Sequence, residues 1–127
     1  MAKVTVCFCI STEKDMDMDM FTKKLGIIPT DIFKKTPSKP FSGNEWSLEI
    51  KKENTIYAND VAKELLNIIY PKLEILKSLQ SRYNHIEYSL VYLIDPYEGE
   101  KAKIIIDKET MMFAKEINAD LMIDQLY

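Results

Sequence analysis

The sequence predicts an α+β fold in which one mostly antiparallel five-stranded sheet carries its helices on one face. Residues 3–10 and 85–95 alternate apolar and polar side chains with the period of two that β-strands require. Residues 59–82 instead repeat apolar side chains at helical spacing. Strand-like and helix-like segments therefore follow one another along the chain, and helices with one apolar stripe can cover one side of a sheet.

The first predicted strand, residues 3–10, reads KVTVCFCI. Its apolar face carries Val4, Val6, Phe8 and Ile10. Ser11 or Thr12 offers a helix cap after this strand, and the helix is expected to run to Leu25. Gly26 then supplies the left-handed residue that ends it.

Residues 27–45 predict a long connection, because they hold three of the five prolines. Such a connection is uncommon in a compact domain unless it has a task. Its lysines, Lys34, Lys35 and Lys39, could meet an acidic partner, and Trp46 at its base could anchor a contact if it is exposed. The alternatives are a surface loop pinned to the core and a buried Trp46, which its alternation with Leu48 favours.

The second half of the chain predicts the remaining elements. Pro71 should divide the helical region into helices at 59–69 and 71–82, with a single kinked helix as the alternative. The segment 85–95 is expected to be the central strand, with Tyr88 and Tyr92 on its buried face. The other expected elements are a strand at 46–50, a strand at 102–107, a helix at 108–118 with Met112, Phe113 and Ile117 inward, and a strand at 120–127. This order suggests a single domain over residues 1–127 with a ferredoxin-like arrangement and an inserted helix pair.

Composition and charge narrow the classes of partner. The net charge is −3, and only one of the 17 basic residues, Arg82, is an arginine, so nucleic-acid binding is not expected. No apolar run approaches the roughly 20 residues of a membrane helix. Because the N-terminus enters a strand pattern at once instead of a signal peptide, we expect a cytoplasmic protein that does not contact a membrane.

The candidate chemical groups are few. Cys7 and Cys9 suit neither a comfortable disulfide nor a redox motif and are expected to be packed, reduced thiols. One histidine, His85, cannot build a multi-histidine metal site, and no phosphate-binding glycine motif occurs. We therefore expect no enzyme activity, no metal and no cofactor. A nucleophilic pair of His85 with Cys7 or Cys9 would require the strands to bring them together.

The sheet face away from the helices should be partly apolar. Its expected residues are Thr5, Cys7, Cys9, Ser47, Glu49, Ser89, Val91 and Leu93. Exposing the apolar residues of such a face to water is unfavourable. We expect it to be covered by the 27–45 loop or by a partner, which could be a second copy of the chain.

Several short motifs resemble a known family. They are KVTVCFCIS at the start, Leu25-Gly26-Ile27 with Pro29-Thr30, Trp46-Ser47-Leu48, the helix pair meeting at Pro71, the strand at 86–94, IIIDKETM, and the closing Asp124 and Tyr127. Together they are similar to the bacterial family catalogued as domain of unknown function 4279. Members often have a Lys-Gly step after Pro-Thr, whereas here Lys34 and Lys35 are followed by Thr36. The resemblance implies a small cytoplasmic bacterial protein without established enzymatic activity.

The sequence thus favours a non-enzymatic interaction module. By analogy with small α+β families that accompany secreted toxins, it would be an immunity-type protein that blocks a protein partner. Its contact residues would be Lys34, Lys35, Lys39 and Trp46. The alternative is a domain that binds a small molecule or peptide in the cleft between the sheet and the 27–45 loop.

Overall fold

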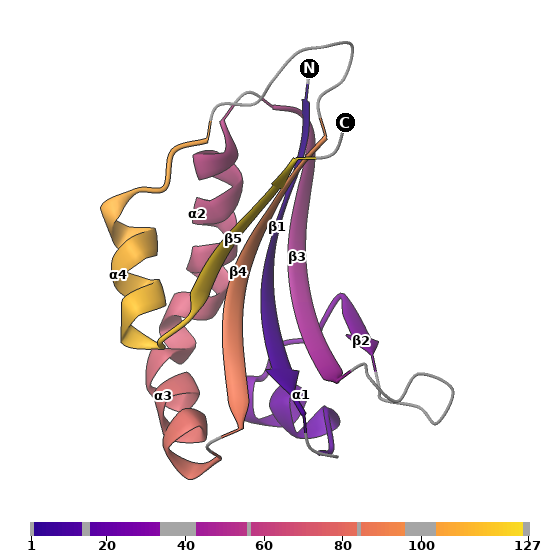
Figure 1. Cartoon of the computed structure of the whole chain (residues 1–127), viewed down its shortest axis with the longest axis vertical. Coiled ribbons are helices and arrows are strands. Elements are labelled where there is room, and N and C mark those ends of the chain that lie inside the picture. Colours follow the sequence, from indigo (N-terminus) through magenta and orange to yellow (C-terminus); the bar gives the residue numbers. More distant parts are fainter. Residues whose placement is uncertain are drawn as a thin grey trace.

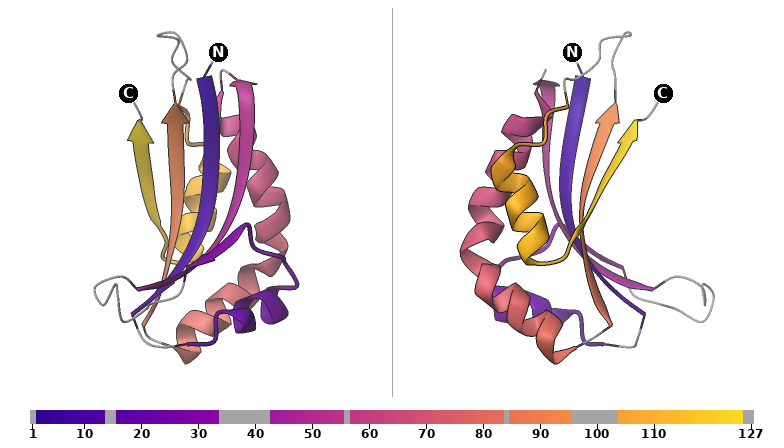
Figure 2. Two further views of the ribbon diagram at one scale, coloured as in Figure 1. Left: turned by 90° about the vertical axis from the view of Figure 1, so that its right-hand side faces the viewer. Right: turned by 60° about the vertical axis from the view of Figure 1, so that its left-hand side comes forward.

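The computed structural model describes residues 2–13, 16–33, 43–55, 57–83, 85–95 and 104–125, and these form two layers. Figure 1 shows a twisted sheet with helices along one side of it, and Figure 2 shows that the other side carries no helix. In chain order the elements are β1 (Ala2–Thr12), α1 (Asp19–Leu25), β2 (Asp31–Phe33), β3 (Asn44–Thr55), α2 (Ala58–Ile69), the 3-10 turn η1 (Tyr70–Lys72), α3 (Leu73–Arg82), β4 (Ile86–Asp95), α4 (Lys108–Glu116) and β5 (Asp120–Gln125).

The five strands of the described residues form one mixed sheet in the order β2-β3-β1-β4-β5. β1 pairs antiparallel with both β3 and β4, and β2 pairs antiparallel with β3, whereas β4 and β5 are parallel. The sheet is therefore mostly antiparallel, as expected, with one parallel pair. β1 takes the central position that we expected for β4, because β1 has a strand on each side and two more follow beyond them. The ferredoxin-like arrangement stays a prediction.

Two predicted elements differ from the structure. The helix expected from Ser11 or Thr12 begins only at Asp19, because β1 continues through Thr12 and pairs there with Ile86. The strand expected at 102–107 is not formed in its described part, because residues 104–107 belong to no strand. The fifth strand of the sheet is instead β2, inside the segment that we expected to lack regular structure.

Other boundaries follow the local signals. Gly26 ends α1 with φ at 67°, a conformation that glycine adopts without strain. Helices α2 and α3 are separate and meet at η1, which contains Pro71. Asp107 begins α4, since its carboxylate accepts hydrogen bonds from the Thr110 backbone N–H at 2.9 Å and from the Thr110 hydroxyl at 2.8 Å. None of the helices in these ranges combines the length and apolar composition needed to cross a membrane.

The core lies between the sheet and the helices. Every predicted inward residue of the first strand and of β4 is buried, including Phe8, Tyr88 and Tyr92. The Phe8 ring packs against Tyr88 with centroids 5.7 Å apart and meets Trp46 edge-on at 6.4 Å. This aromatic cluster connects the three adjacent strands β3, β1 and β4 and stabilises the centre of the sheet.

Candidate functional site

The predicted lysine surface lies mostly outside the described residues. Lys34, Lys35 and Lys39 belong to residues 34–42, which the structure does not describe, so their role stays a prediction. Trp46 is described and is 0% exposed. Its indole N–H donates to the Thr22 hydroxyl on α1 at 3.0 Å. The core alternative for Trp46 is confirmed, and its side chain does not reach the surface where an anchor would have to lie.

The open face of the sheet has the residues that the sequence placed there. Cys7 lies between Glu49 and Val91, and Cys9 lies between Ser47 and Ser89. Both cysteines are free and buried, at 8% and 5% exposure, although no described helix lies over them. Their burial comes in part from their position in the central strand, which has a neighbouring strand on each side.

The two thiols touch one another, with 3.1 Å between their Sγ atoms. This contact, burial, and the nearby charge of Glu45 raise the pKa of the Cys9 thiol well above its ordinary value of 9.0. A thiol needs the opposite shift to become a strong nucleophile at neutral pH. Cys9 therefore has the properties of a buried packing residue and not those of a reactive thiol.

His85 lies outside the strand pairing that holds these thiols. Cys9 is paired with Ser89, and the register places Ile86 opposite Thr12, so His85 lies beyond the last residue of β1. Its Nε2 is 3.0 Å from the Met16 sulfur, and its ring meets Tyr83 edge-on at 6.2 Å. The fold does not bring the histidine and the cysteines together, and the nucleophilic pair is not formed.

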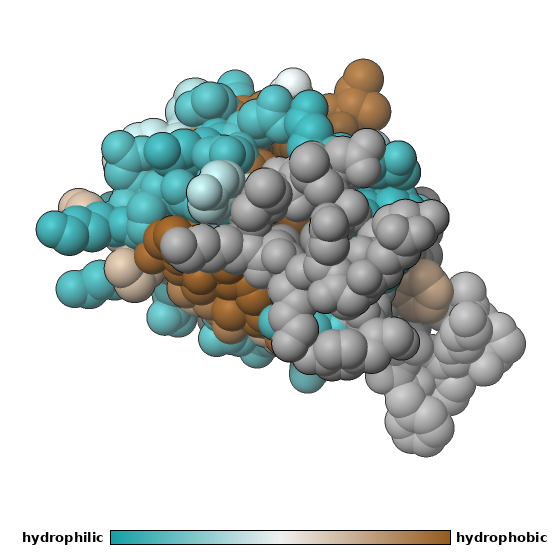
Figure 3. Space-filling model, turned by 90° about the horizontal axis from the view of Figure 1, so that it is seen from above, coloured by the Kyte–Doolittle hydropathy of each residue, from teal (hydrophilic) through white to brown (hydrophobic). Residues whose placement is uncertain are grey.

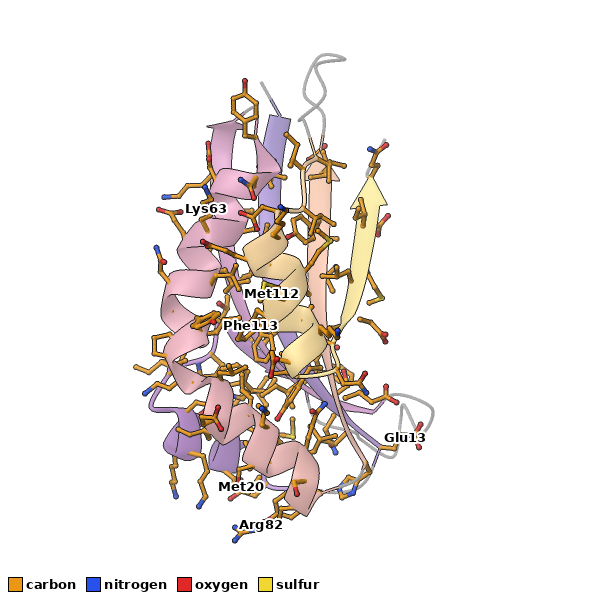
Figure 4. The ribbon with its side chains drawn as sticks, turned by 90° about the vertical axis from the view of Figure 1, so that its left-hand side faces the viewer. Glu13, Met20, Lys63, Arg82, Met112 and Phe113 are labelled. Atoms are coloured by element: carbon orange, nitrogen blue, oxygen red, sulfur yellow. The ribbon has the colours of Figure 1, made fainter. Side chains whose placement is uncertain are left out.

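The helical layer carries a groove that brings exposed apolar side chains together. It lies between the end of α2 with η1 on one side and α4 on the other, and its volume is about 550 Å³. Figure 4 looks onto this flank and labels Met112 and Phe113 on α4. The lining residues are Leu66, Asn67, Tyr70, Pro71, Glu109 and Met112.

One wall of the groove is packed against the core, and its apolar side chains are partly exposed. Tyr70 packs its ring against buried Phe113, with centroids 5.6 Å apart, and still leaves 52% of its surface exposed. Met112 is 66% exposed, on the opposite wall. Lys77 on α3 and Glu116 on α4 form an ion pair at 3.2 Å, which joins α4 to the other helix of the pair. The arrangement can hold an apolar group between Tyr70 and Met112, with polar contacts from Asn67 and Glu109.

The chain's relatives can now be considered beside this geometry. The model of the family described as a domain of unknown function (DUF4279) matches residues 2–127. The chain belongs to this family. The resemblance read from the short motifs is thereby confirmed over nearly the whole chain. No curated protein and no solved structure matches.

The groove of this DUF4279 chain was not predicted from the sequence. Met112 was expected to point inward, but Phe113 and Ile117 form the buried stripe and Met112 lies about 100° around the helix from Phe113. Ile68 on α2 is another apolar residue outside the buried stripe of its helix, at 38% exposure. The available signal was a surplus of apolar residues: Met111, Met112 and Phe113 are consecutive, and one narrow stripe cannot bury all three.

Proposed function

We propose that this chain is a non-catalytic protein-binding module and that its partner contacts the groove between α2 and α4. The observation that carries the proposal is the pair of large exposed side chains, Tyr70 and Met112, on either wall of an apolar groove. Exposed apolar side chains gathered on a shaped surface are typical of contact sites. Tyrosine supplies a rigid contact, whereas methionine adapts to the shape that it meets.

The lining of the groove suggests the chemistry of the partner segment. An apolar side chain placed between Tyr70 and Met112 would exclude water from both, and burying one methionine side chain contributes about 1.5–3 kcal/mol. Glu109 on the rim would favour a lysine or arginine beside that anchor. A partner presenting an apolar residue next to a basic one fits these features.

A second candidate is a small-molecule site. The volume of about 550 Å³ falls within the usual range for ligand pockets, and this favours it. Against it, the exposure of Tyr70 and Met112 leaves the groove open, whereas ligand pockets enclose most of their ligand. The cleft that the sequence suggested, between the sheet and residues 27–45, involves residues outside the described ranges.

The finer form of the proposal is an immunity-type role in which binding occludes the active surface of a toxin. Fold-level analogy to small α+β immunity proteins supports it, and so does the placement of His85 outside the strand pairing that holds the thiols, which leaves contact as the simplest mode of action. We further propose that the chain works in the cytoplasm. The cysteine content supports this, because the chain has only two cysteines, whereas small secreted domains commonly carry several disulfides.

Site-specific crosslinking tests the groove. A photo-reactive amino acid at Met112 should capture a protein in cells that carry the gene naturally, and the neighbouring gene product should be examined first. Ile28 provides a matched control, because it is 86% exposed and lies in the connection before β2. In chains without the photo-reactive residue, Met112→Glu should abolish co-purification of the captured protein. Ile28→Glu should leave that co-purification unchanged.

Equal capture from both positions would contradict the groove as the contact surface. Capture of no protein, together with a small molecule retained in native mass spectrometry, would favour the second candidate. Because Met112 is exposed, Met112→Glu should change the free energy of unfolding by no more than about 0.5 kcal/mol, so lost binding would not report unfolding.

A further inference from the structure

β5 is an edge strand whose residues are apolar and yet uncovered. It pairs with β4 on one side, and no described strand pairs with its other side. All six of its residues are exposed, and Leu121, Met122 and Ile123 are 37%, 49% and 49% exposed. An apolar edge of this kind is a ready template for another strand, and natural proteins usually blunt it. The opposite edge of the sheet is blunted in this way, because β2 has only three residues.

The register with β4 assigns the side chains of β5 to the two faces of the sheet. Leu121 is level with buried Leu90, and Ile123 is level with buried Tyr92, so both lie on the helix side. Asp120, Met122 and Asp124 are level with Ser89, Val91 and Leu93 and lie on the open face. The strand thus presents the apolar side chains of Leu121 and Ile123 on its helix face. On its open face it presents Met122 with one carboxylate on each side of it.

We propose that β5 is a docking edge for an extended segment of a partner protein, which adds a sixth strand to the sheet. The segment carries apolar residues at the positions beside Leu121 and Ile123 and lysine or arginine at the positions beside Asp120 and Asp124. Backbone hydrogen bonds supply affinity in this mode, and the alternate side chains supply specificity. The partner is recognised by a basic and apolar alternation over about five residues.

The positions of the carboxylates argue for a basic partner and against a second copy. In an antiparallel pair of two β5 strands centred on Met122, Asp120 of each chain would face Asp124 of the other. Like charges that are directly opposite destabilise a strand pair, whereas opposite charges stabilise it. The same two aspartates therefore disfavour self-association in this register and favour a lysine-bearing strand.

The neighbouring helix extends the apolar side of this edge. Glu109 and Met112 line the groove toward α2, and helical geometry places Met111 about 100° around α4 from Met112, on the flank away from α2. Met111 is 47% exposed. Figure 3, viewed from the end where α4 begins and β5 ends, shows an apolar area among polar surroundings. An added strand would shield part of this flank from water.

This inference concerns a different surface from the groove and can fail or succeed separately. The probe is a blocked peptide with the pattern TKVTVKT, whose palindromic order suits either strand direction. Its binding to the isotope-labelled full chain is followed by the backbone amide NMR signals of residues 119–125. The matched controls are TEVTVET, which reverses the charge, and TKVTVKT N-methylated at all five central residues, which keeps the side chains and removes the backbone donors on both edges of the peptide.

We expect TKVTVKT to shift the β5 signals and to bind about tenfold more tightly than TEVTVET, because two attractive pairs replace two repulsive ones. The N-methylated peptide should not bind. The double variant Asp120→Lys with Asp124→Lys should reverse the preference between the two charged peptides. Met112→Glu should bind TKVTVKT as the natural chain does, since it alters only the groove.

The absence of β5 shifts with TKVTVKT at about 1 mM would overturn the proposal. Equal binding of the N-methylated peptide would overturn it as well, because no strand is then added. Shifts that appear without peptide as the protein concentration rises would assign the edge to a second copy instead. The peptide comparisons use the natural chain, so they decide the matter even if the double variant does not fold.

Discussion

The central strand β1 and the edge strand β5 have similar apolar content but opposite surroundings. From Val4 to Ile10 every residue of β1 is buried, including those on the open face, whereas every residue of β5 is exposed. β1 has a strand on each side and helices over one face, while β5 pairs with one strand among the described residues and has little helical cover. Position within the sheet, more than side-chain type, therefore decides which apolar residues stabilise the fold and which are available to a partner.

The largest effect in this comparison is expected at Phe8 in β1. Phe8→Ala should lower the free energy of unfolding by about 3–5 kcal/mol, because it leaves a cavity beside Trp46 and Tyr88. Chemical denaturation followed by tryptophan fluorescence measures it. A loss below about 1 kcal/mol would show that the centre of the sheet is no more tightly packed than its edge.

The buried thiol of β1 predicts a pH effect. Contact with Cys7 and burial raise the pKa of Cys9 in the folded state, so above its ordinary value of 9.0 the unfolded chain loses this proton and the folded chain keeps it. Stability present below pH 9.0 should then fall by up to about 1.4 kcal/mol per pH unit. The difference between the natural chain and Cys9→Ala isolates this slope. A difference that stays constant through about pH 10 would contradict the prediction.

Removing the N-terminal cap of α4 should cause a smaller loss of stability, with its local effect in that helix. Asp107→Ala should lower the free energy of unfolding by about 1 kcal/mol and speed amide hydrogen exchange in α4, because the hydrogen bonds from Thr110 are lost. Asp107→Asn, which keeps an acceptor oxygen, should lose less. Equal losses in the two variants would mean that the cap does not hold this helix.

The same cap should weaken in acid. Burial alone would raise the pKa of Asp107, but the hydrogen bonds from Thr110 and the charge of Lys63 outweigh it and lower the pKa below its ordinary value of 3.8. The cap's contribution is therefore present above pH 3.8 and is lost as the pH falls through the lowered pKa. Asp107→Ala should show no such acid-dependent loss from this site.

The smallest effect is expected in β5. Ile123→Ala removes a side chain of the same apolar class as the core residues, but one that is already half exposed. The free energy of unfolding should change by about 0.5 kcal/mol or less. This variant is the matched counterpart of Phe8→Ala in the same denaturation assay. A loss comparable to that of Phe8→Ala would mean that β5 belongs to the core and is not a surface available for docking.

Local signals in the sequence predicted much of the fold. The alternation in β1 and β4, the break at Pro71, the stop at Gly26 and the cap at Asp107 each depend on residues within a few positions of one another. The errors arose where pairing between strands that are distant in the sequence decided the bounds of an element. β1 continued through Thr12 because β4 lies beside it, and three residues of the proline-rich connection became β2 because β3 offered them an edge. The candidate site was missed because the groove joins residues from α2 and α4 that are about forty positions apart.

The sequence by itself determined most element types, most of the buried stripes and the family, since periodicity, caps and short motifs depend on neighbouring residues. The tertiary structure alone decided the strand order, the separation of His85 from the thiols, the exposure of Met112 and the open edge at β5. Strand order and side-by-side packing determine which apolar residues are left without a neighbour. No local pattern records that, because a residue such as Leu121 reads the same whether a strand lies beside it or water does.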